Sequence, residues 1–564
     1  MQVGRPPQGE GLLKKLSEGS TARSGWRGLL QFLVFLPVLI QAGLALRGIR
    51  DWVPVWSWYP DPGYQYLLAG ASLVSGGAPA LVYHPGTSFQ WLVGVVELAH
   101  YSLMGSGSFF TDLVASPEAY ARSVGSLVAI LYVAALFFVA WRMLRYLGPW
   151  PALVFQFMML WGLPVVAGAR FHLWPESLVM VCALLTIGLL ARPWKLGSAS
   201  LSVASAISLG VIGAVGVSAK VIYLPMVLVV AVCLTWRRNL AFFASLALTS
   251  VLIIVPVASR LPAMWEWFSS IATTPGRHGQ VVETSALDNL FLGHGFLAGY
   301  LRWYLPVMVT LAVTLVGLVA VKKSVKDPLV RGALAVSLGL VVVIASTVKQ
   351  SEIRDLVVIV PLIASLTVLL FSSVLGVVSA GKARAATIVG VLGITGFLAL
   401  HGLVHAGNFA EAEKQRIDEV VRDSRVVTAA IDGGRWGLGY NVWTEQNALL
   451  FGSNDGLMLG VEFSDDLVNR EISERFPKAL YFDLWNGNLQ AIGDDSRLRV
   501  VTCQQLSDFL ATGPLGLLVE SPGHVVISQG GDEIVLSDGR ATFVGPTKVG
   551  NYLAYEFTSL QCDQ

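Results

Sequence analysis

The residues best suited to chemistry in this sequence are ionisable side chains next to long apolar segments. Asp61 lies in the acidic, aromatic segment WYPDPGYQYLLAG, directly after the first long apolar run. Further ionisable residues collect at the ends of other apolar runs, whose middles contain almost none. Carboxylates near cationic groups could take a proton from an acceptor hydroxyl while the cations hold a phosphate leaving group. This set consists of Asp61, His84, Glu97, Arg170, His172, Glu176, Lys220, Lys349, Glu352, Arg354 and Asp355.

Each of the main candidates also has a purely structural interpretation. Asp61 precedes Pro62, and an aspartate N-cap followed by proline favours the start of a helix. Glu176 follows Pro175 and would place a negative charge near the positive end of a helix dipole. The basic candidates could be interfacial anchors whose charged ends reach water. The residues alone leave both interpretations open.

The composition indicates a polytopic α-helical membrane protein. Of the 564 residues, 54% are hydrophobic and 13% are charged, and the mean hydropathy is +0.63. Apolar runs of ~20 residues, the length needed to cross ~30 Å of hydrocarbon, recur along the chain. The net charge of +2 and the lack of a basic block give no sign of a nucleic-acid partner. The four cysteines form no CxxC motif or cysteine–histidine cluster, so we expect no zinc site.

Basic residues beside the apolar runs predict the topology, because cytoplasmic loops hold lysine and arginine in excess. Placing every basic cluster inside gives about eleven crossings, a cytoplasmic segment over 1–26 and an extracytoplasmic C-terminus. The first apolar run is long for a signal peptide, so we expect it to be retained as a helix in a bacterial cytoplasmic membrane. The membrane domain is expected over 27–404, with crossings at 27–48, 121–144, 150–168, 176–192, 200–219, 221–236, 239–258, 299–321, 329–347, 355–376 and 386–404.

The first outside loop, 51–119, carries several of the candidate residues. It contains two moderately apolar stretches, 63–75 and 88–104, which we expect to be helices lying in the plane of the membrane interface. The second stretch includes Glu97, whose charge would be costly at mid-bilayer. The loop is therefore expected to stay on one side of the membrane.

A second outside loop is expected over 259–298, and it includes His278. A loop of this length between membrane helices often serves as a lid or a binding loop. A surface loop without such a role is the alternative interpretation.

The residues 405–564 predict a soluble domain outside the membrane. A charged helix over 408–425 is followed by short β-rich runs with helices between them, which is typical of an α/β or α+β domain. The glycine-rich GGRWGLGY lacks the spacing of a nucleotide-binding loop and predicts a turn. Cys503 and Cys562 could pair in an oxidising compartment or stay apart. Strands are expected at VVTAAI, ALLFG, ALYFDL, LRVVT, LGLLVE, HVVIS and YLAYEF, and helices at 467–476 and 503–510.

An ordered set of these features resembles the GT-C superfamily of membrane glycosyltransferases. The pattern runs from YPDPGYQYLLAG through GGAP, YHPGTSFQWLVG and YARSVGSLVAILYVAALFFVAWRMLRYLG to PESLVMVCALLTIGLLAR. It is most similar to the protein O-mannosyltransferases and the lipid A aminoarabinose transferases, which have an acidic first outside loop followed by two in-plane helices. Arg122 matches an arginine that opens their second crossing helix, although it could also be a helix-end anchor. Pro85–Gly86 matches the turn before their second in-plane helix, and Lys349 and Arg354 resemble a basic element before a late helix.

The resemblance implies that a sugar is transferred, with inversion, from a polyprenyl-phosphate donor to a glycan, lipid or protein acceptor outside the cytoplasmic membrane. Asp61 would be the general base that deprotonates the acceptor hydroxyl, as a carboxylate activates water in inverting glycosidases. Lys220, Lys349 and Arg354 would hold the donor phosphate. Membrane lipids would be the remaining partners.

The sequence departs from the family pattern directly after Asp61. Many relatives carry a second acid there, whereas this chain has Pro62. Glu176 and Glu97 are the candidates for a second carboxylate. Because one carboxylate is a poor site for a divalent cation, the resemblance leaves a metal cofactor open. His84 and His278, together with Glu97, are candidates for substrate contacts in the outside loops.

Two other functions are kept as alternatives. A flippase or transporter of lipid-linked precursors would need ionisable residues near the midplane, or internal repeats, and the sequence shows neither. A polymerase or ligase of lipid-linked glycans would share the outside charges but would have its largest loop among the last helices. This chain has its long loops early and in mid-chain, which favours glycosyl transfer.

Overall fold

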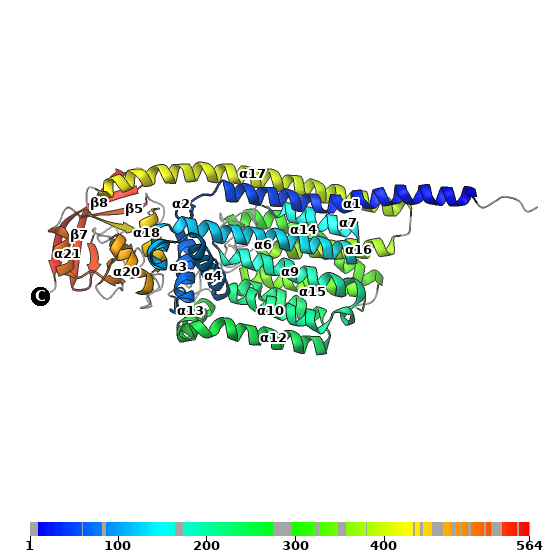
Figure 1. Ribbon diagram of the computed structural model, residues 1–564, viewed down its shortest axis with the longest axis horizontal. Coiled ribbons are helices and arrows are strands. Elements are labelled where there is room, and N and C mark those ends of the chain that lie inside the picture. Colours follow the sequence, from blue (N-terminus) through cyan, green and yellow to red (C-terminus); the bar gives the residue numbers. More distant parts are fainter. Residues whose placement is uncertain are drawn as a thin grey trace, which may run out of the picture.

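The described part of the chain forms a long helical bundle with a β-sheet at one end, as Figure 1 shows. The computed structural model describes residues 10–58, 60–79, 81, 86–163, 173–273, 296–322, 326–347, 357–378, 381–432, 435–439, 444–453, 466–476, 480–483, 488–493, 498–511, 515–520, 533–549 and 552–562.

The bundle confirms a helical protein that spans the membrane several times. Every predicted crossing overlaps a helix, and seven helices in the described residues are long and apolar enough to cross a membrane. Others, such as Val203–Ala219, are apolar but shorter. The number of crossings therefore stays a prediction. The bundle helices are α1 (Glu10–Arg50), α6 (Pro117–Tyr146), α7 (Pro149–Trp161), α9 (Pro175–Leu196), α10 (Val203–Ala219), α11 (Leu224–Cys233), α12 (Trp236–Ile254), α14 (Phe296–Lys322), α15 (Pro328–Thr347), α16 (Ile359–Val377) and α17 (Lys382–Asp432).

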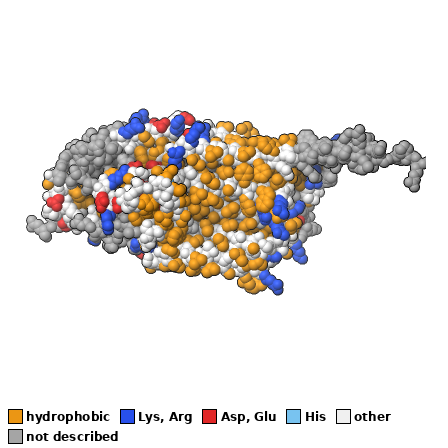
Figure 2. All heavy atoms as spheres, in the orientation of Figure 1, with side chains coloured by type: hydrophobic (Ala, Val, Ile, Leu, Met, Phe, Trp, Pro, Cys, Tyr) orange, Lys and Arg blue, Asp and Glu red, His pale blue; other side chains and the backbone are white. Residues whose placement is uncertain are grey.

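Large apolar side chains cover the outside of the bundle, which only a lipid environment would favour. Phe32, Val313 and Phe397 are 56%, 68% and 68% exposed, and an exposed apolar surface of this extent indicates contact with a membrane. Figure 2 shows hydrophobic side chains over the middle of the bundle and charged ones gathered toward its two ends. The centre is formed by α9 and α16, most of whose residues are buried.

Three helices extend beyond the segments predicted for them. α1 begins at Glu10, inside the segment 1–26 that was expected to precede the first crossing. α17 continues as one helix of 51 residues through the charged stretch 408–425. A 3-10 helix, η3 (Val255–Arg260), and α13 (Leu261–Thr273) continue from α12 into the predicted loop 259–298. In each case the chain keeps helical backbone where polar residues suggested that a helix would end.

The first outside loop folds into four helices. They are α2 (Val55–Trp58), α3 (Pro60–Val74), α4 (Thr87–Met104) and α5 (Phe109–Ala115). α3 and α4 coincide with the two helices predicted over 63–75 and 88–104. They cross at Gly70 and Gly94, where a Cβ on Gly94 would lie 2.4 Å from the Gly70 carbonyl oxygen. The small residues thus allow the two backbones to pack directly against each other.

Within the described residues after α17, the chain forms an eight-stranded mixed sheet with three helices. The strand order is β2-β1-β5-β8-β7-β6-β3-β4, and β2 also pairs with β3. β1 runs parallel to β2 and β5, whereas the β5–β8, β8–β7 and β7–β6 pairs are antiparallel. The elements are β1 (Arg435–Gly439), α18 (Glu445–Ser453), α20 (Asp466–Arg475), β2 (Leu480–Asp483), β3 (Asn488–Ile492), β4 (Leu498–Val500), α21 (Cys503–Leu510), β5 (Leu515–Glu520), β6 (Glu533–Leu536), β7 (Gly539–Val549) and β8 (Tyr552–Cys562).

Three local predictions in this region are wrong. VVTAAI is the last part of α17, and ALLFG belongs to α18, because short apolar runs fit a helix or a strand equally well. GGRWGLGY was predicted to be a turn, but Arg435–Gly439 within it forms β1 between two parallel neighbours. Pairing on both sides compensates there for the low strand propensity of glycine. HVVIS lies outside the described residues.

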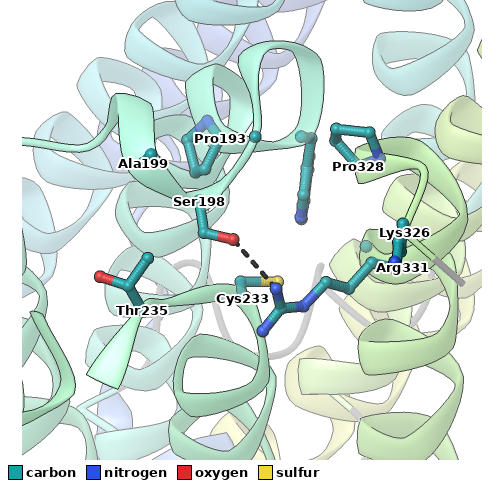
Figure 3. Close-up of a pocket in the computed structure, with 11 residues that line it drawn as sticks. Pro193, Ser198, Ala199, Cys233, Thr235, Lys326, Pro328 and Arg331 are labelled. Carbon is teal, nitrogen blue, oxygen red and sulfur yellow. Dashed lines mark hydrogen bonds between the residues drawn. The ribbon is translucent and has the colours of Figure 1, made fainter. Parts of the chain in front are cut away.

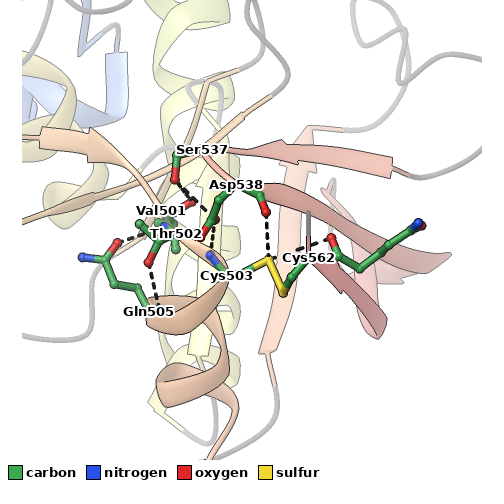
Figure 4. Close-up of a disulfide and its surroundings, with 8 residues drawn as sticks. Val501, Thr502, Cys503, Gln505, Ser537, Asp538 and Cys562 are labelled. Atoms are coloured by element: carbon green, nitrogen blue, oxygen red, sulfur yellow. Dashed lines mark hydrogen bonds between the residues drawn. A yellow bond between two sulfur atoms is a disulfide. The ribbon is translucent and has the colours of Figure 1, made fainter. Parts of the chain in front are cut away.

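Cys503 and Cys562 form a disulfide, so the sequence alternative in which they pair is the correct one. Their Cα atoms are 5.9 Å apart, and the bond joins the start of α21 to the end of β8 (Figure 4). Thr502 and Gln505 form a capping box that fixes the first turn of α21. Disulfides persist in oxidising compartments, which agrees with the extracytoplasmic location expected for these residues.

We predict that replacing both cysteines with serine will destabilise the sheet without unfolding the bundle. The disulfide closes a loop of 59 residues, and a cross-link of this length stabilises a domain by about 2–4 kcal/mol. Limited proteolysis of the purified protein should cut the double variant within 435–562 faster than wild type. A control labels free thiols, to show that Cys503 and Cys562 are bonded in wild type. If they are bonded and the two proteins are still cut at equal rates, the bond adds no stability.

Candidate active site

A buried ion pair lies at one end of the bundle and joins two residues of the predicted site. The Lys220 Nζ atom lies 2.5 Å from the Glu176 Oε1 atom, and the two side chains are 6% and 1% exposed. Burying two charges is expensive unless they are paired and hydrogen-bonded. The sequence placed both residues at one predicted membrane face, and the structure brings them into direct contact.

Each partner of this pair stands at the end of a membrane helix. Glu176 is in the first turn of α9, which Pro175 opens. Lys220 follows the last residue of α10, and its extended backbone (φ −160°, ψ 138°) ends that helix. Its N–H still donates to the Gly216 carbonyl, and its carbonyl accepts from Tyr223. The pair thus lies where α9 begins and α10 ends.

The start of α4 is fastened to the end of α10, directly beside Lys220. The Gly86 N–H donates to the Ala219 carbonyl at 3.0 Å. The Ser88 hydroxyl donates to the Val215 carbonyl at 2.8 Å. The second helix of the first outside loop is therefore held against the buried ion pair.

Gly86 is required at this junction for two reasons. Its φ of +52° lies in the left-handed region, which side chains disfavour. A Cβ at this position would also lie 2.7 Å from the ring of Tyr66 in α3. On the other side of residues 82–85, the Leu81 carbonyl accepts a hydrogen bond from the Gln90 amide. α3, α4 and α10 therefore meet at Gly86.

The backbone of Asp61 lies in the first turn of α3, and its side chain is outside the described residues. α3 begins at Pro60, so Asp61 is the second residue of the helix and not its N-cap. It precedes Tyr66, which contacts Gly86, by about one and a half turns. α3 therefore leads from the predicted base toward the end of α10.

A buried carboxylate, Glu118, fixes the beginning of α3. It lies in the first turn of α6 and accepts hydrogen bonds from Trp52 Nε1 (3.0 Å), the Val55 N–H (2.8 Å) and the Tyr64 hydroxyl (2.8 Å). Burial, together with the Glu118 charge, raises the pKa of Tyr64 well above its usual value. The phenol therefore stays protonated and donates a hydrogen bond to Glu118. Glu118 thus connects α2 and α3 to the membrane bundle.

Glu97 is also buried, but its environment is different. It lies on α4 roughly 16 Å along the axis from Gly86, and neither carboxyl oxygen has a hydrogen-bond partner among the described residues. Burial raises the pKa of Glu97 well above its usual value. Burial therefore favours the protonated carboxyl of Glu97 over the carboxylate.

Several predicted site residues fall outside the part of the chain that the structure describes. Arg122 is described, and its guanidinium donates to the Ile49 carbonyl at 3.0 Å, which ties α6 to α1 and fits the anchor interpretation. Within the described residues, no group of three or more histidine, cysteine or acidic side chains could hold a metal ion. The residues outside the description are His84, Arg170, His172, His278, Lys349, Glu352, Arg354 and Asp355.

The region that follows α17 covers the helix carrying Asp61. α18 packs on α3, and Gly452 approaches so closely that a Cβ would lie 2.9 Å from the Tyr64 carbonyl carbon. α20 packs on α5, where the Arg475 guanidinium donates to the Val114 carbonyl. The sheet region is thus attached directly to the first outside loop.

Comparison with solved structures shows which fold the chain adopts. ArnT from Cupriavidus metallidurans in the apo state shares 13% sequence identity with the chain, with a TM-score of 0.50 over 95% of this chain and 98% of ArnT. The chain has the GT-C fold. The same protein bound to undecaprenyl phosphate matches at 12% identity, with a TM-score of 0.48 over 94% and 98%. No protein-family model and no curated protein sequence matches the chain.

Sequence reasoning missed the residues that position the site within the GT-C fold. Glu118 follows Pro117 at the start of a crossing helix, where an acid is ordinarily explained by the helix dipole. A tryptophan-rich segment precedes α3 by a few residues, and its N–H donors were the available signal for a buried acceptor. Tyr64 and Tyr66 gave no signal beyond their aromatic character.

We predict that Glu97→Gln will make the protein more stable at neutral pH and will leave it unchanged in acid. The native state keeps this proton to a higher pH than the unfolded chain, so stability falls as pH rises above the pKa of an unfolded glutamate, ~4.3. Each unit by which burial raises that pKa removes about 1.4 kcal/mol at higher pH. Thermal midpoints at pH 4 and pH 8 in detergent would test this, with exposed Glu266→Gln as control.

A variant that lowers stability equally at both pH values would contradict this account of Glu97. So would a variant that is less stable than wild type only at pH 8, because that result would require an ionised Glu97 with a cationic partner.

We predict that Glu118→Ala will lower the thermal midpoint far more than Tyr64→Phe. The alanine leaves four donors without this acceptor, at about 1–3 kcal/mol for each buried group. Tyr64→Phe removes one hydrogen bond together with its donor, which costs about 1 kcal/mol. If Glu118→Ala is no worse than the exposed control Glu266→Ala, Glu118 does not hold α3.

Proposed function

We propose that this protein is an inverting glycosyltransferase that moves a sugar from a polyprenyl-phosphate donor to an acceptor outside the cytoplasmic membrane. The GT-C fold supports the class of enzyme, and the sequence resemblance to O-mannosyltransferases and aminoarabinose transferases supports the class of donor. The acceptor is a glycan, a lipid or a protein. The basic clusters beside the helices support a cytoplasmic N-terminus and an extracytoplasmic sheet region.

The observation that carries this proposal is the buried Glu176–Lys220 pair beside the start of α4. A lysine at the end of a membrane helix can hold a phosphate as a point charge. While no donor is bound, Glu176 neutralises Lys220, which avoids an uncompensated buried cation. A donor phosphate would replace Glu176 as the ionic partner of Lys220. Lys349 and Arg354 are proposed to provide the other contacts with this phosphate.

In the proposed reaction Asp61 is the general base. Its carboxylate takes the proton of the acceptor hydroxyl as that oxygen forms a bond to the anomeric carbon. The bond between the anomeric carbon and the phosphate oxygen breaks, and polyprenyl phosphate leaves with its charge held by the basic residues. Because burial favours the protonated form of Glu97, Glu176 is the better candidate for a second carboxylate. His84 and His278 remain candidates for contacts with the substrates.

The proposal is tested by measuring transfer from radiolabelled polyprenyl-phosphate sugars in membranes that contain equal amounts of each variant. Asp61→Asn should lower kcat by about 100-fold or more, the usual contribution of a general base. The double variant Glu176→Gln/Lys220→Met removes both charges together, so neither member of the pair is left buried without the other. It should raise KM for the donor, whereas Arg50→Gln, an exposed cation paired with Asp51, should leave KM unchanged.

Three outcomes separate the possibilities. Equal transfer by wild type and Asp61→Asn would keep the glycosyltransferase but assign the base to another carboxylate. An unchanged donor KM in a folded double variant would make the ion pair purely structural. No transfer by wild type from any donor in the panel would contradict the proposal and favour a flippase or a polymerase of lipid-linked glycans.

A further inference from the structure

A cavity of about 290 Å³ lies at the other end of the bundle from the Glu176–Lys220 pair. It is enclosed by the end of α9, the 3-10 helix η1 (Ser198–Ser200), the link between α11 and α12, and the start of α15. Glu176 is in the first turn of α9 and Trp194 of the cavity is in its last turn, so roughly 30 Å separates the two places. The cavity is therefore not part of the candidate active site.

Arg331 is held at the wall of this cavity by neutral acceptors. Its Nε atom donates to the Val232 carbonyl at 3.0 Å, and its two Nη atoms donate to the Ser198 hydroxyl (3.1 Å) and the Leu234 carbonyl (3.5 Å). No carboxylate among the described residues forms an ion pair with it. Figure 3 shows the guanidinium joined to Ser198 by a hydrogen bond, with Cys233 beside it in this view. A guanidinium has five N–H donors, so two are left for a further acceptor.

The rest of the cavity is also electropositive. Lys326 is exposed and lines it. Arg238 supports the opposite wall by donating to the Ser198 and Ala199 carbonyls. The adjacent acid, Asp327, accepts from the Leu329 and Val330 N–H groups and so caps α15. Among the described residues around this cavity, positive charges therefore outnumber negative ones.

A buried donor in the wall has only a weak acceptor. The Trp194 side chain is 1% exposed, and its indole N–H finds no oxygen or nitrogen acceptor among the described residues. The Cys233 thiol beside it is the acceptor within reach, and sulfur is a weak acceptor. Gly332 packs directly against the indole, since a Cβ there would lie 3.0 Å from the indole nitrogen. An anionic oxygen in the cavity would be a stronger acceptor for this N–H.

Apolar side chains next to the cavity are exposed on the outside of the bundle. Leu196 is 58% exposed and precedes Gly197 of the cavity, and Trp236 is 71% exposed and follows Thr235. Tryptophan is enriched at the membrane interface, and basic pockets between membrane helices bind the head groups of acidic lipids. The surroundings of the cavity thus suit acyl chains beside a phosphate.

We propose that this cavity binds a phosphate group, carried by an acidic phospholipid of the adjacent leaflet. Arg331 and the Trp194 N–H contact the phosphate oxygens, and Lys326 adds a second positive charge at the opening. The site is independent of the proposed sugar transfer and would bind the lipid whether or not the enzyme is active.

The test measures binding of phosphatidylglycerol and phosphatidylcholine to the purified full-length chain by native mass spectrometry. Wild type should bind phosphatidylglycerol more tightly, and Lys326→Gln should weaken that binding about fivefold, the usual effect of one basic residue. Lys382→Gln is the matched control, because Lys382 is an exposed base at the same end of the bundle but outside the cavity. It should leave binding unchanged.

A second arm titrates inorganic phosphate against the lipid-free protein. One outcome is that inorganic phosphate binds wild type more tightly than Lys326→Gln while wild type shows no preference for phosphatidylglycerol over phosphatidylcholine. That result would overturn the lipid assignment and leave a site for soluble phosphate. Because Arg331 also ties α15 to α11, Arg331→Gln is compared only if its thermal midpoint matches wild type. Equal affinity of wild type, Lys326→Gln and Lys382→Gln for both probes would overturn the proposal.

Discussion

The buried ion pair between Glu176 and Lys220 sets the main constraint on this protein. Each ion loses its hydration at a cost of several kcal/mol, and only a close, enclosed partner compensates for that loss. The enclosure comes from the packed ends of α9 and α10 and from the start of α4, which hydrogen bonds fasten to α10 at Gly86. The position of the first outside loop, and with it α3, therefore depends on the packing around one pair of charges.

Two other buried carboxyl groups show how strongly the environment decides their chemistry. Glu118 accepts four hydrogen bonds, from Trp52, α2 and α3, and these offset part of the cost of burying a carboxylate. Glu97 receives none from the described residues, and burial raises its pKa well above the usual value. Both lie in or next to the first outside loop, so a list of acids in that loop does not say which of them is charged.

The sequence predicted the helices of the bundle and placed Glu176 and Lys220 at one end of it, because apolar length and flanking charge are local signals. It could not show that these two residues touch, since they lie 44 positions apart on different helices. Glu118 was missed because its donors come together only in the folded structure. The short apolar runs near α17 and α18 were assigned to strands because such runs fit either element, and packing on neighbouring helices decides between them.

The unbroken course of α17 has a mechanical consequence. Its 51 residues extend over roughly 75 Å, from its contact with α7 in the bundle to the sheet. The sheet region is also attached to the first outside loop through α18 and α20. α17, the sheet region and the helices of the first outside loop are therefore connected to one another in a ring, and α3 with Asp61 is part of that ring. A bilayer thickness that changes the tilt of α17 would pull on α3, so the lipid composition of the membrane would act on the geometry of the site.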